Sequence, residues 1–242
     1  MIAQVNEVQL ERLGDSLRRL HELLPLKERQ QSLEKQHIEV HRAILQSLVE
    51  RGQPLTVEEI AGMLGSNKAA RYAVALLGSY DLIIRDELAV KNENNGDLVV
   101  LDAMGGRPVG AYPMTTEETP HKIVVNGNDL YAMCAVDALA VGVIFNTEVE
   151  INSKCYVTGE PVHIRQKGNE ILNAQPSDEI RVGIRWQRPT QCAAHVLCRQ
   201  MVFLKDPGVA QQWCIDPPTM DLFTLNEAVA FGEAFFLPLL RD

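Results

Sequence analysis

Two residues that can do chemistry lie three positions apart in the most apolar part of the sequence. The stretch LYAMCAVDAL, residues 130–139, contains Cys134 and Asp137. On a helix, residues three apart share one face, so this spacing predicts a thiol and a carboxylate side by side. A carboxylate in apolar surroundings costs free energy unless another group compensates for it. Either the pair does chemistry, or Cys134 is a small core residue and Asp137 points to water.

The position of Cys134 along the predicted helix affects its acidity. The turn sequence NGND immediately precedes the stretch, so we expect Cys134 in the first turns of a helix. The exposed amide groups of a helix N-terminus stabilise a thiolate relative to a thiol. Spacing alone does not separate this reactive cysteine from a structural one.

The other cysteines give weaker signals. The chain has five, and an odd number without a visible secretory signal predicts reduced thiols in the cytosol. Cys192, His195 and Cys198 have the spacing C-x2-H-x2-C, but AHVLCRQMVFL is predicted to be a strand, on which His195 faces away from the two cysteines. Four convergent ligands cannot be named, so a structural zinc site is not expected. Cys155 and Cys214 are expected to be structural.

The elements before these residues are predicted to be helical and then winged-helix-like. Residues 4–50 form helices that are interrupted at Pro25 and carry a leucine stripe. Thr56 and Glu59 have the spacing of a capping box, and the turn LGSN separates that helix from a second one that ends near Leu77. Strands in LIIRDELAV and DLVVLDA would complete a winged helix. The leucine stripe comprises Leu10, Leu13, Leu17, Leu20 and Leu24.

The second half is predicted to be a mostly antiparallel sheet core. Strands are expected in HKIVVNG, TEVEINSKCYV, VHIRQ, EIRVGIRW and AHVLCRQMVFL, followed by the helix TLNEAVAFGEAFF. Short turns and the absence of helical crossovers favour antiparallel pairing. The predicted class is therefore α+β, an N-terminal helical and winged-helix-like region followed by a mostly antiparallel sheet core with flanking helices. We divide it into a helical extension (1–36), a winged-helix-like domain (37–120) and a catalytic α+β domain (121–242).

Charge argues against nucleic acid as a partner. The net charge is −9 and the isoelectric point is near 5.2. Residues 37–112 contain seven Lys and Arg against ten Asp and Glu, which is a weak footprint for phosphate. The longest apolar stretch, LYAMCAVDALAVGVIF, is too short and too polar for a membrane span, so no membrane partner is expected and we expect a cytoplasmic protein.

Three motifs together resemble the alkylmercury (organomercurial) lyases, the MerB family. LYAMCAVDAL resembles the first catalytic motif, INSKCYVTGEPV is similar to a second block, and CRQMVFL followed by AQQW matches a third. In the third block Met201 takes the place of a valine and Leu204 the place of a second phenylalanine. The resemblance extends over residues 50–236 and identifies Cys198, not Cys192, as the second catalytic cysteine.

The resemblance implies protonolysis of a carbon–mercury bond to a hydrocarbon and thiolate-bound Hg(II). Cys134, Asp137 and Cys198 would be the catalytic and mercury-binding residues, because thiolates are the best ligands for a soft metal and a carboxylic acid can protonate the leaving carbon. An apolar pocket would raise the pKa of Asp137 by desolvation.

The same resemblance implies several partners. These are an organomercurial or other organometallic substrate, and cellular thiols or a mercuric-ion reductase as metal acceptor. No cofactor is implied beyond a low-molecular-weight thiol that removes product, and the leucine stripe makes a homodimer a further prediction. The alternatives are a winged-helix regulator that senses a soft metal through Cys134 and Cys198, and a metal-binding protein without catalysis.

Overall fold

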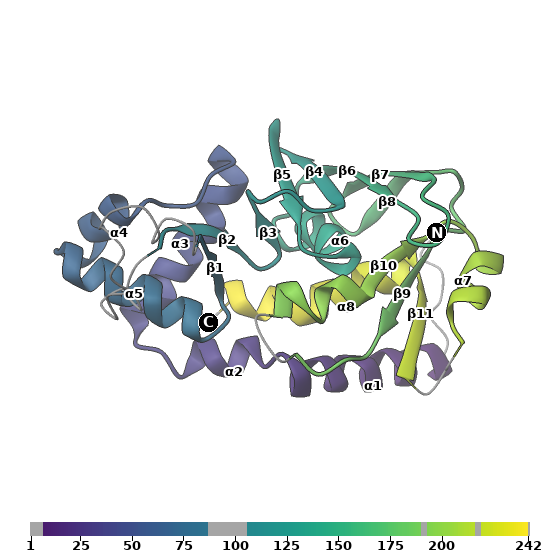
Figure 1. Ribbon diagram of the computed structural model, residues 1–242, viewed down its shortest axis with the longest axis horizontal. Coiled ribbons are helices and arrows are strands. Elements are labelled where there is room, and N and C mark those ends of the chain that lie inside the picture. The colour runs from purple at the N-terminus through teal and green to yellow at the C-terminus, as the bar shows by residue number, and fades with distance from the viewer. Residues whose placement is uncertain (1–6, 87–105, 190–192, 216–218, 242) are drawn as a thin grey trace, which may run out of the picture.

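Five helices make up the first part of the chain. The structure is a computed structural model that describes residues 7–86, 106–189, 193–215 and 219–241 (Figure 1). The predicted break at Pro25 and the Thr56–Glu59 capping box are both confirmed, and Ser66 caps the following helix. The helices are α1 (Glu7–Leu23), α2 (Leu26–Gln31), α3 (Lys35–Arg51), α4 (Val57–Leu64) and α5 (Asn67–Ser79).

Two antiparallel sheets follow, which confirms the predicted α+β class. The larger sheet has the strand order β1-β2-β3-β5-β4-β6-β7-β8, and the smaller has the order β10-β9-β11. Every pairing in both sheets is antiparallel. The strands are β1 (Ile83–Arg85), β2 (Pro108–Ala111), β3 (Met114–Thr115), β4 (His121–Val125), β5 (Asn128–Ala132), β6 (Glu148–Lys154), β7 (Pro161–Lys167), β8 (Glu170–Gln175), β9 (Arg181–Arg185), β10 (Met201–Leu204) and β11 (Met220–Thr224).

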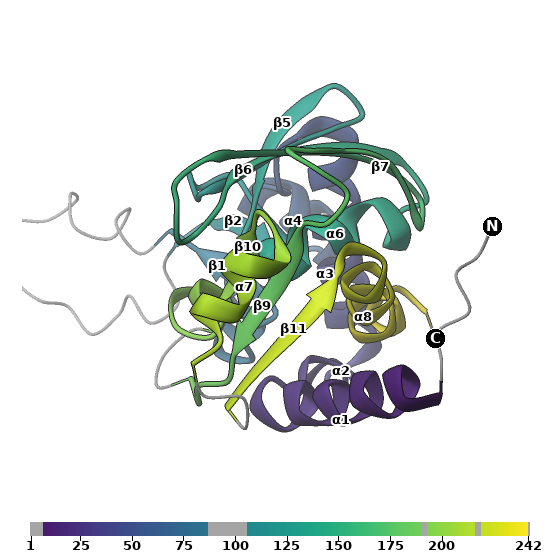
Figure 2. The same ribbon diagram turned by 90° about the vertical axis from the view of Figure 1, so that its right-hand side faces the viewer.

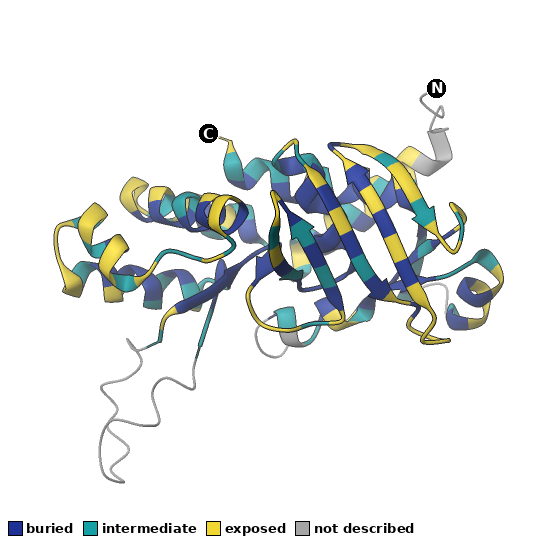
Figure 3. Ribbon diagram, turned by 90° about the horizontal axis from the view of Figure 1, so that it is seen from above, coloured by how far each residue is buried: buried dark blue, intermediate teal, exposed yellow. Residues whose placement is uncertain are grey.

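Along β6 and β7, one face of the large sheet is exposed and the other covers the core. Residues alternate between exposed and buried along β6 and β7, as the banding in Figure 3 shows. This alternation follows from the period of two along a strand. Residues such as Val149 and Ile151 face inward, toward the helix α6 (Ala135–Ile144).

The helix α6 is the central element of the core. It packs against the large sheet on one side and against α8 (Leu225–Leu240) on the other, and α8 in turn packs against α1 (Figures 1 and 2). Gly232 permits the close crossing, since a Cβ at that position would lie 3.0 Å from the Cβ of Ala140. All residues of α6 but Val143 are buried. A functional group on this helix is therefore isolated from water.

The N-terminal helix α1 lies on the C-terminal part of the chain. Arg12 forms an ion pair with Glu227 at 2.6 Å, and Ser16 donates a hydrogen bond to Asp221 at 2.8 Å. Leu20 and Leu24 are buried in the chain's own core. These two leucines of the stripe are covered within the chain and are not available to a second copy. The homodimer remains a prediction that Leu20 and Leu24 do not support.

The division into three domains remains a prediction. The large sheet runs across residue 120, because β1, β2 and β3 belong to the same sheet as β4 to β8. Helices α3 to α5 precede β1 and β2 in the order of a winged helix. The predicted strand DLVVLDA lies outside the described residues. No helix in the described part of the chain is long and apolar enough to cross a membrane.

Two predicted boundaries are wrong, and some strands were missed. AHVLCRQMVFL is not one strand: 3-10 turns at Ala193–His195 and Cys198–Gln200 precede β10, so only Met201–Leu204 is extended and paired with β9. The turn NGND does not lead directly into the Cys134 helix, since β5 comes between them. The strands β8 and β11 were not predicted.

Candidate active site

Cys134 lies at the junction between β5 and α6. It is the N-cap residue of the helix, one position before the helical residues in which we expected it, and its side chain is 0% exposed. The Sγ atom accepts a hydrogen bond from the backbone N–H of Asp137 at 3.3 Å. A cysteine thus occupies a position that serine, threonine or aspartate usually fills, because sulfur can accept the same amide hydrogen.

Asp137 points into the protein and not to water. Its side chain is 2% exposed, so the interpretation of a solvated carboxylate is wrong. Its Oδ2 atom is buried without a hydrogen-bond partner among the described residues. Burial raises the pKa of Asp137 to about 7, although hydrogen bonds from the thiols of Cys134 and Cys198 act in the opposite direction. The carboxyl group can therefore gain or lose a proton near neutral pH.

Cys198 lies next to Cys134 and Asp137 but comes from a different part of the chain. It opens the 3-10 turn Cys198–Gln200 before β10 and is 3% exposed. The Sγ atoms of Cys134 and Cys198 and a carboxylate oxygen of Asp137 all lie within 4.8 Å of one another. The structure therefore brings together the three residues that the sequence singled out.

Both thiols hold their protons more tightly than an exposed cysteine does. Burial raises the pKa of Cys134 well above its ordinary value, and its hydrogen bond to Cys198 and the charge of Asp137 add to the effect. That hydrogen bond by itself lowers the pKa of Cys198, but burial and the charges of Asp137 and Asp81 together raise it. The expected stabilisation of a thiolate by the helix N-terminus is thus outweighed by burial. Without a metal, both residues are thiols.

The loop that carries Cys198 is held by the N-terminal helices. Asp81, which follows α5, accepts a hydrogen bond from the backbone N–H of Ala193 at 3.1 Å. The guanidinium of Arg29 from α2 lies 3.7 Å from the same Asp81 oxygen. The sequence analysis missed Asp81 as a positioning residue. Its φ of 58° is a position where aspartate is tolerated better than most residues, but this cannot be read from the sequence.

A third sulfur atom in the site was also missed. The Sδ atom of Met201 lies 3.6 Å from the Sγ atom of Cys134. The sequence showed Met201 only as a substitution for a valine in the third motif. The spacing C-x-x-M, with two sulfur atoms one turn apart, is the signal that could have identified it.

The remaining cysteines lie outside this cluster where the structure describes them. Cys155 is buried after β6, in a turn closed by hydrogen bonds with Gly159 and Glu160. Burial acts to raise the pKa of Cys155, but hydrogen bonds from Thr158 and from backbone amides lower it overall. Cys214 is half-buried at the end of α7 (Pro207–Trp213). Cys192 and the side chain of His195 are outside the described residues.

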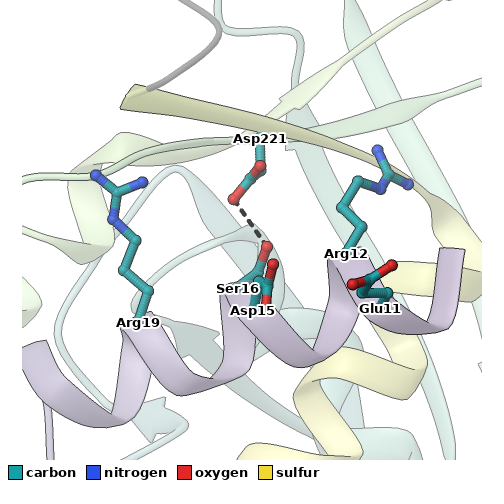
Figure 4. Close-up of a pocket in the computed structure, with 6 residues that line it drawn as sticks. All are labelled: Glu11, Arg12, Asp15, Ser16, Arg19 and Asp221. Atoms are coloured by element: carbon teal, nitrogen blue, oxygen red, sulfur yellow. Dashed lines mark hydrogen bonds between the residues drawn. The ribbon is translucent and has the colours of Figure 1, made fainter. Parts of the chain in front are cut away.

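A surface pocket between α1 and β11 is separate from the cluster. It has a volume of about 340 Å³ and shares no residue with Cys134, Asp137 and Cys198 (Figure 4). The indole of Trp186 and the hydroxyl of Ser16 both donate to Asp221 Oδ2 there, at 2.6 and 2.8 Å. These contacts fix α1 to the small sheet. The lining residues are Glu11, Arg12, Asp15, Ser16, Arg19 and Asp221.

Comparison with known proteins agrees with this geometry. The chain is 28% identical over 192 residues to an alkylmercury lyase of Staphylococcus epidermidis, and the match covers 79% of each chain. It is 30% identical over 128 residues to an alkylmercury lyase of Bacillus cereus, which covers 53% of this chain and 58% of that one. The fold is similar to that of the mercury-bound form of MerB2, with a TM-score of 0.69 and 22% identity over 89% of this chain and 98% of the other.

The family comparison covers the part of the chain that holds the cluster. The sequence pattern of the MerB family, alkylmercury lyase, matches residues 114–237, which is just over half of the chain. This range contains β5, α6 and the turn before β10, and therefore all of the cluster. The chain belongs to the alkylmercury lyase family.

Proposed function

We propose that this chain is an enzyme that cleaves carbon–mercury bonds by protonolysis, releasing a hydrocarbon and retaining Hg(II) on Cys134 and Cys198. The observation that carries the proposal is the buried cluster of two thiols and one carboxyl group within 4.8 Å. Two soft sulfur ligands suit mercury, and a carboxyl group suits the transfer of a proton to carbon.

The first step is an exchange of thiols on the metal. An organomercurial enters as its thiolate adduct, R–Hg–SR′, and one of the two cysteines displaces R′S from mercury. The proton of that cysteine leaves with the displaced group as R′SH. The chain now holds R–Hg through one sulfur, with the second thiol and Asp137 beside it.

The second step uses the remaining proton. The second cysteine bonds to mercury and passes its proton to Asp137, whose buried Oδ2 atom has no hydrogen-bond partner in the part of the chain that the structure describes and can receive it. Asp137 then protonates the carbon as the carbon–mercury bond breaks, and the electron pair of that bond forms the new C–H bond. The products are RH, R′SH and Hg(II) bound by two thiolates. The two thiol protons account for both products.

The state of Asp137 supports its role as the proton carrier. A carboxyl group with its pKa near 7 is acidic enough to give up a proton and basic enough to take one from a metal-bound thiol. Burial also removes water that would compete for the carbon. A passive mercury store would need only the two thiols, whereas a buried carboxyl group destabilises the fold. Asp137 therefore favours an enzyme over a metal-binding protein without catalysis.

The proposed partners follow from the chemistry. The substrate is an organomercurial, no cofactor takes part in the reaction, and a low-molecular-weight thiol removes Hg(II) from the two cysteines. A cellular thiol or a mercuric-ion reductase would serve as the acceptor, which places the reaction in the cytoplasm, where such thiols are reduced.

Release of benzene from phenylmercury, measured by gas chromatography with excess low-molecular-weight thiol, tests the proposal. The parent protein should release benzene over many turnovers, and Cys134→Ser and Cys198→Ser should not. Cys214→Ser is the matched control, because Cys214 is half-buried outside the cluster and should leave the rate unchanged. A parent protein that binds Hg(II) but releases no benzene would refute the proposal.

A further inference from the structure

Met201 adds a third sulfur atom to the cluster. It is the first residue of β10, its side chain is 3% exposed, and its Sδ atom lies 3.6 Å from Cys134 Sγ. Its backbone N–H donates to the carbonyl of Cys198. The 3-10 turn that positions Cys198 therefore also fixes the backbone from which the Met201 side chain starts. The positions of the thioether and of the Cys198 thiol are coupled through this turn.

A thioether differs chemically from the two thiols. It is neutral, carries no proton, and keeps a lone pair available at any pH. Like a thiolate, it is a soft ligand that favours soft metals over hard ones. At this distance the Sδ atom is one of three acceptors, with Asp137 and Cys198, within reach of the single Cys134 thiol proton, so its lone pair can face the sulfur that will bind mercury. When the thiol proton leaves, the lone pair becomes available to the metal.

We propose that Met201 is a third mercury ligand, whose Sδ atom caps Hg(II) after Cys134 and Cys198 have bound it. This inference rests on the proposed function and extends it to a residue that the family resemblance does not assign, because that pattern has valine here. The two thiolates form the strong bonds. The thioether adds a weaker neutral one without changing the charge of the complex, and no bond of the methionine breaks.

The third ligand would act after the carbon–mercury bond has broken. Before cleavage, the organic group occupies a coordination position on mercury. When the hydrocarbon leaves, that position opens and the thioether can fill it. Met201 should therefore slow the transfer of Hg(II) to small thiols more than it affects hydrocarbon release. Its removal should speed this transfer about tenfold, the lower end of the usual range for losing a supporting group at a metal site.

The chain offers a matched control. Met220 is 6% exposed and begins β11, which pairs with β9 on the edge opposite to β10. Met201→Leu and Met220→Leu remove the same atom from similar surroundings, and exchanges that conserve volume are those that cores tolerate best. The full-length protein is prepared with selenomethionine, loaded with one equivalent of HgCl2, and measured by X-ray absorption at the selenium edge.

The proposal predicts a mercury neighbour of selenium in the parent protein and in Met220→Leu, but not in Met201→Leu. It also predicts faster transfer of Hg(II) to glutathione from Met201→Leu alone. A parent protein without selenium–mercury scattering refutes the proposal, and so does scattering that persists in Met201→Leu. If Met201→Leu does not fold, a crystal structure of the Hg(II)-loaded parent decides, since the Sδ atom either is or is not bonded to mercury.

Failure of this inference and failure of the proposed function are distinguishable. The selenium measurement uses added Hg(II) and needs no turnover, whereas benzene release measures turnover alone. A parent protein that releases benzene but shows no selenium–mercury scattering supports the proposed lyase activity and refutes Met201 as a mercury ligand. A parent protein that shows the scattering but releases no benzene supports Met201 as a mercury ligand and refutes the proposed lyase activity.

Discussion

Replacing Asp137 with asparagine should lower activity and raise stability in the same protein. The amide has nearly the shape of the carboxyl group but cannot carry a proton. Hydrocarbon release should fall about 10²-fold or more, the usual scale for losing a positioned acid. Hg(II) binding should persist, because the sulfur ligands of Cys134 and Cys198 remain.

The gain in stability follows from the pKa of Asp137. Burial raises this pKa from 3.8 to about 7 in the folded protein, so the folded state binds the proton more tightly than the unfolded chain does. The resulting stabilisation is fully present below the unfolded pKa and is lost as the pH rises through the folded pKa. A difference of about three pH units, at 1.36 kcal/mol each, corresponds to about 4 kcal/mol lost at about pH 8.

Asparagine carries no charge whose burial would cost this energy. At about pH 8 the variant should be more stable than the parent by up to about 4 kcal/mol, less about 1–3 kcal/mol for any amide atoms left without partners. Below about pH 4 the parent carboxyl group is protonated in both the folded protein and the unfolded chain, and the advantage of the variant should vanish. Urea unfolding at the two pH values measures the difference directly.

The activity assay is benzene release in a single turnover as a function of pH. The parent rate should fall below about pH 7, because a carboxyl group that is already protonated cannot take the proton of the second thiol. The low rate of Asp137→Asn should not show this decrease at the same pH. A variant that releases benzene at the parent rate would show that the aspartate is structural. A variant that is less stable than the parent at about pH 8 would refute the assigned cause of the pKa shift.

Three further predictions concern the rest of the cluster. Cys134→Ser and Cys198→Ser should each abolish turnover, because one thiolate cannot both hold and activate the metal; benzene assays against the control Cys214→Ser check this. Asp81→Ala should lower turnover about tenfold by loosening the loop of Cys198. Arg29→Ala removes the ion pair with Asp81 and the hydrogen bond to the Tyr80 carbonyl but keeps the Asp81–Ala193 hydrogen bond, so it should have a smaller effect; circular dichroism shows whether both variants fold. In deuterated water the benzene should carry one solvent deuterium, because the transferred proton comes from exchangeable groups, and mass spectrometry detects it.

The helical part of the fold could be predicted from local signals. Pro25, the capping box of Thr56 and Glu59, and the leucine periodicity each act within one or two turns of chain. The β8 strand was harder to predict, because it forms one edge of the large sheet and has few buried residues to mark it. β5 was missed because its pattern merges with the apolar run of α6, so the boundary depends on pairing with β4 and β3.

The candidate site could be predicted in composition but not in arrangement. The spacing of Cys134 and Asp137 placed them on one face, and the resemblance selected Cys198. The burial of Asp137 could not be predicted, because it comes from α8 and the large sheet, which enclose α6 from two sides. The contact between Asp81 and the loop of Cys198 joins residues far apart in the sequence, and a single sequence contains no signal for such a pair.

The burial of the cluster explains why its parts must occur together. Burial alone makes Cys134 and Cys198 poor nucleophiles, since it raises the pKa of both thiols. It also makes Asp137 a base strong enough to take a proton once mercury binds sulfur and acidifies the thiol. In water the thiols would ionise more easily, but a carboxyl group with an ordinary pKa would be too weak a base to hold the proton for the carbon. The dry interior between α6 and the turn of Cys198 thus keeps the proton within the cluster until the metal releases it, and only there can one aspartate serve both steps.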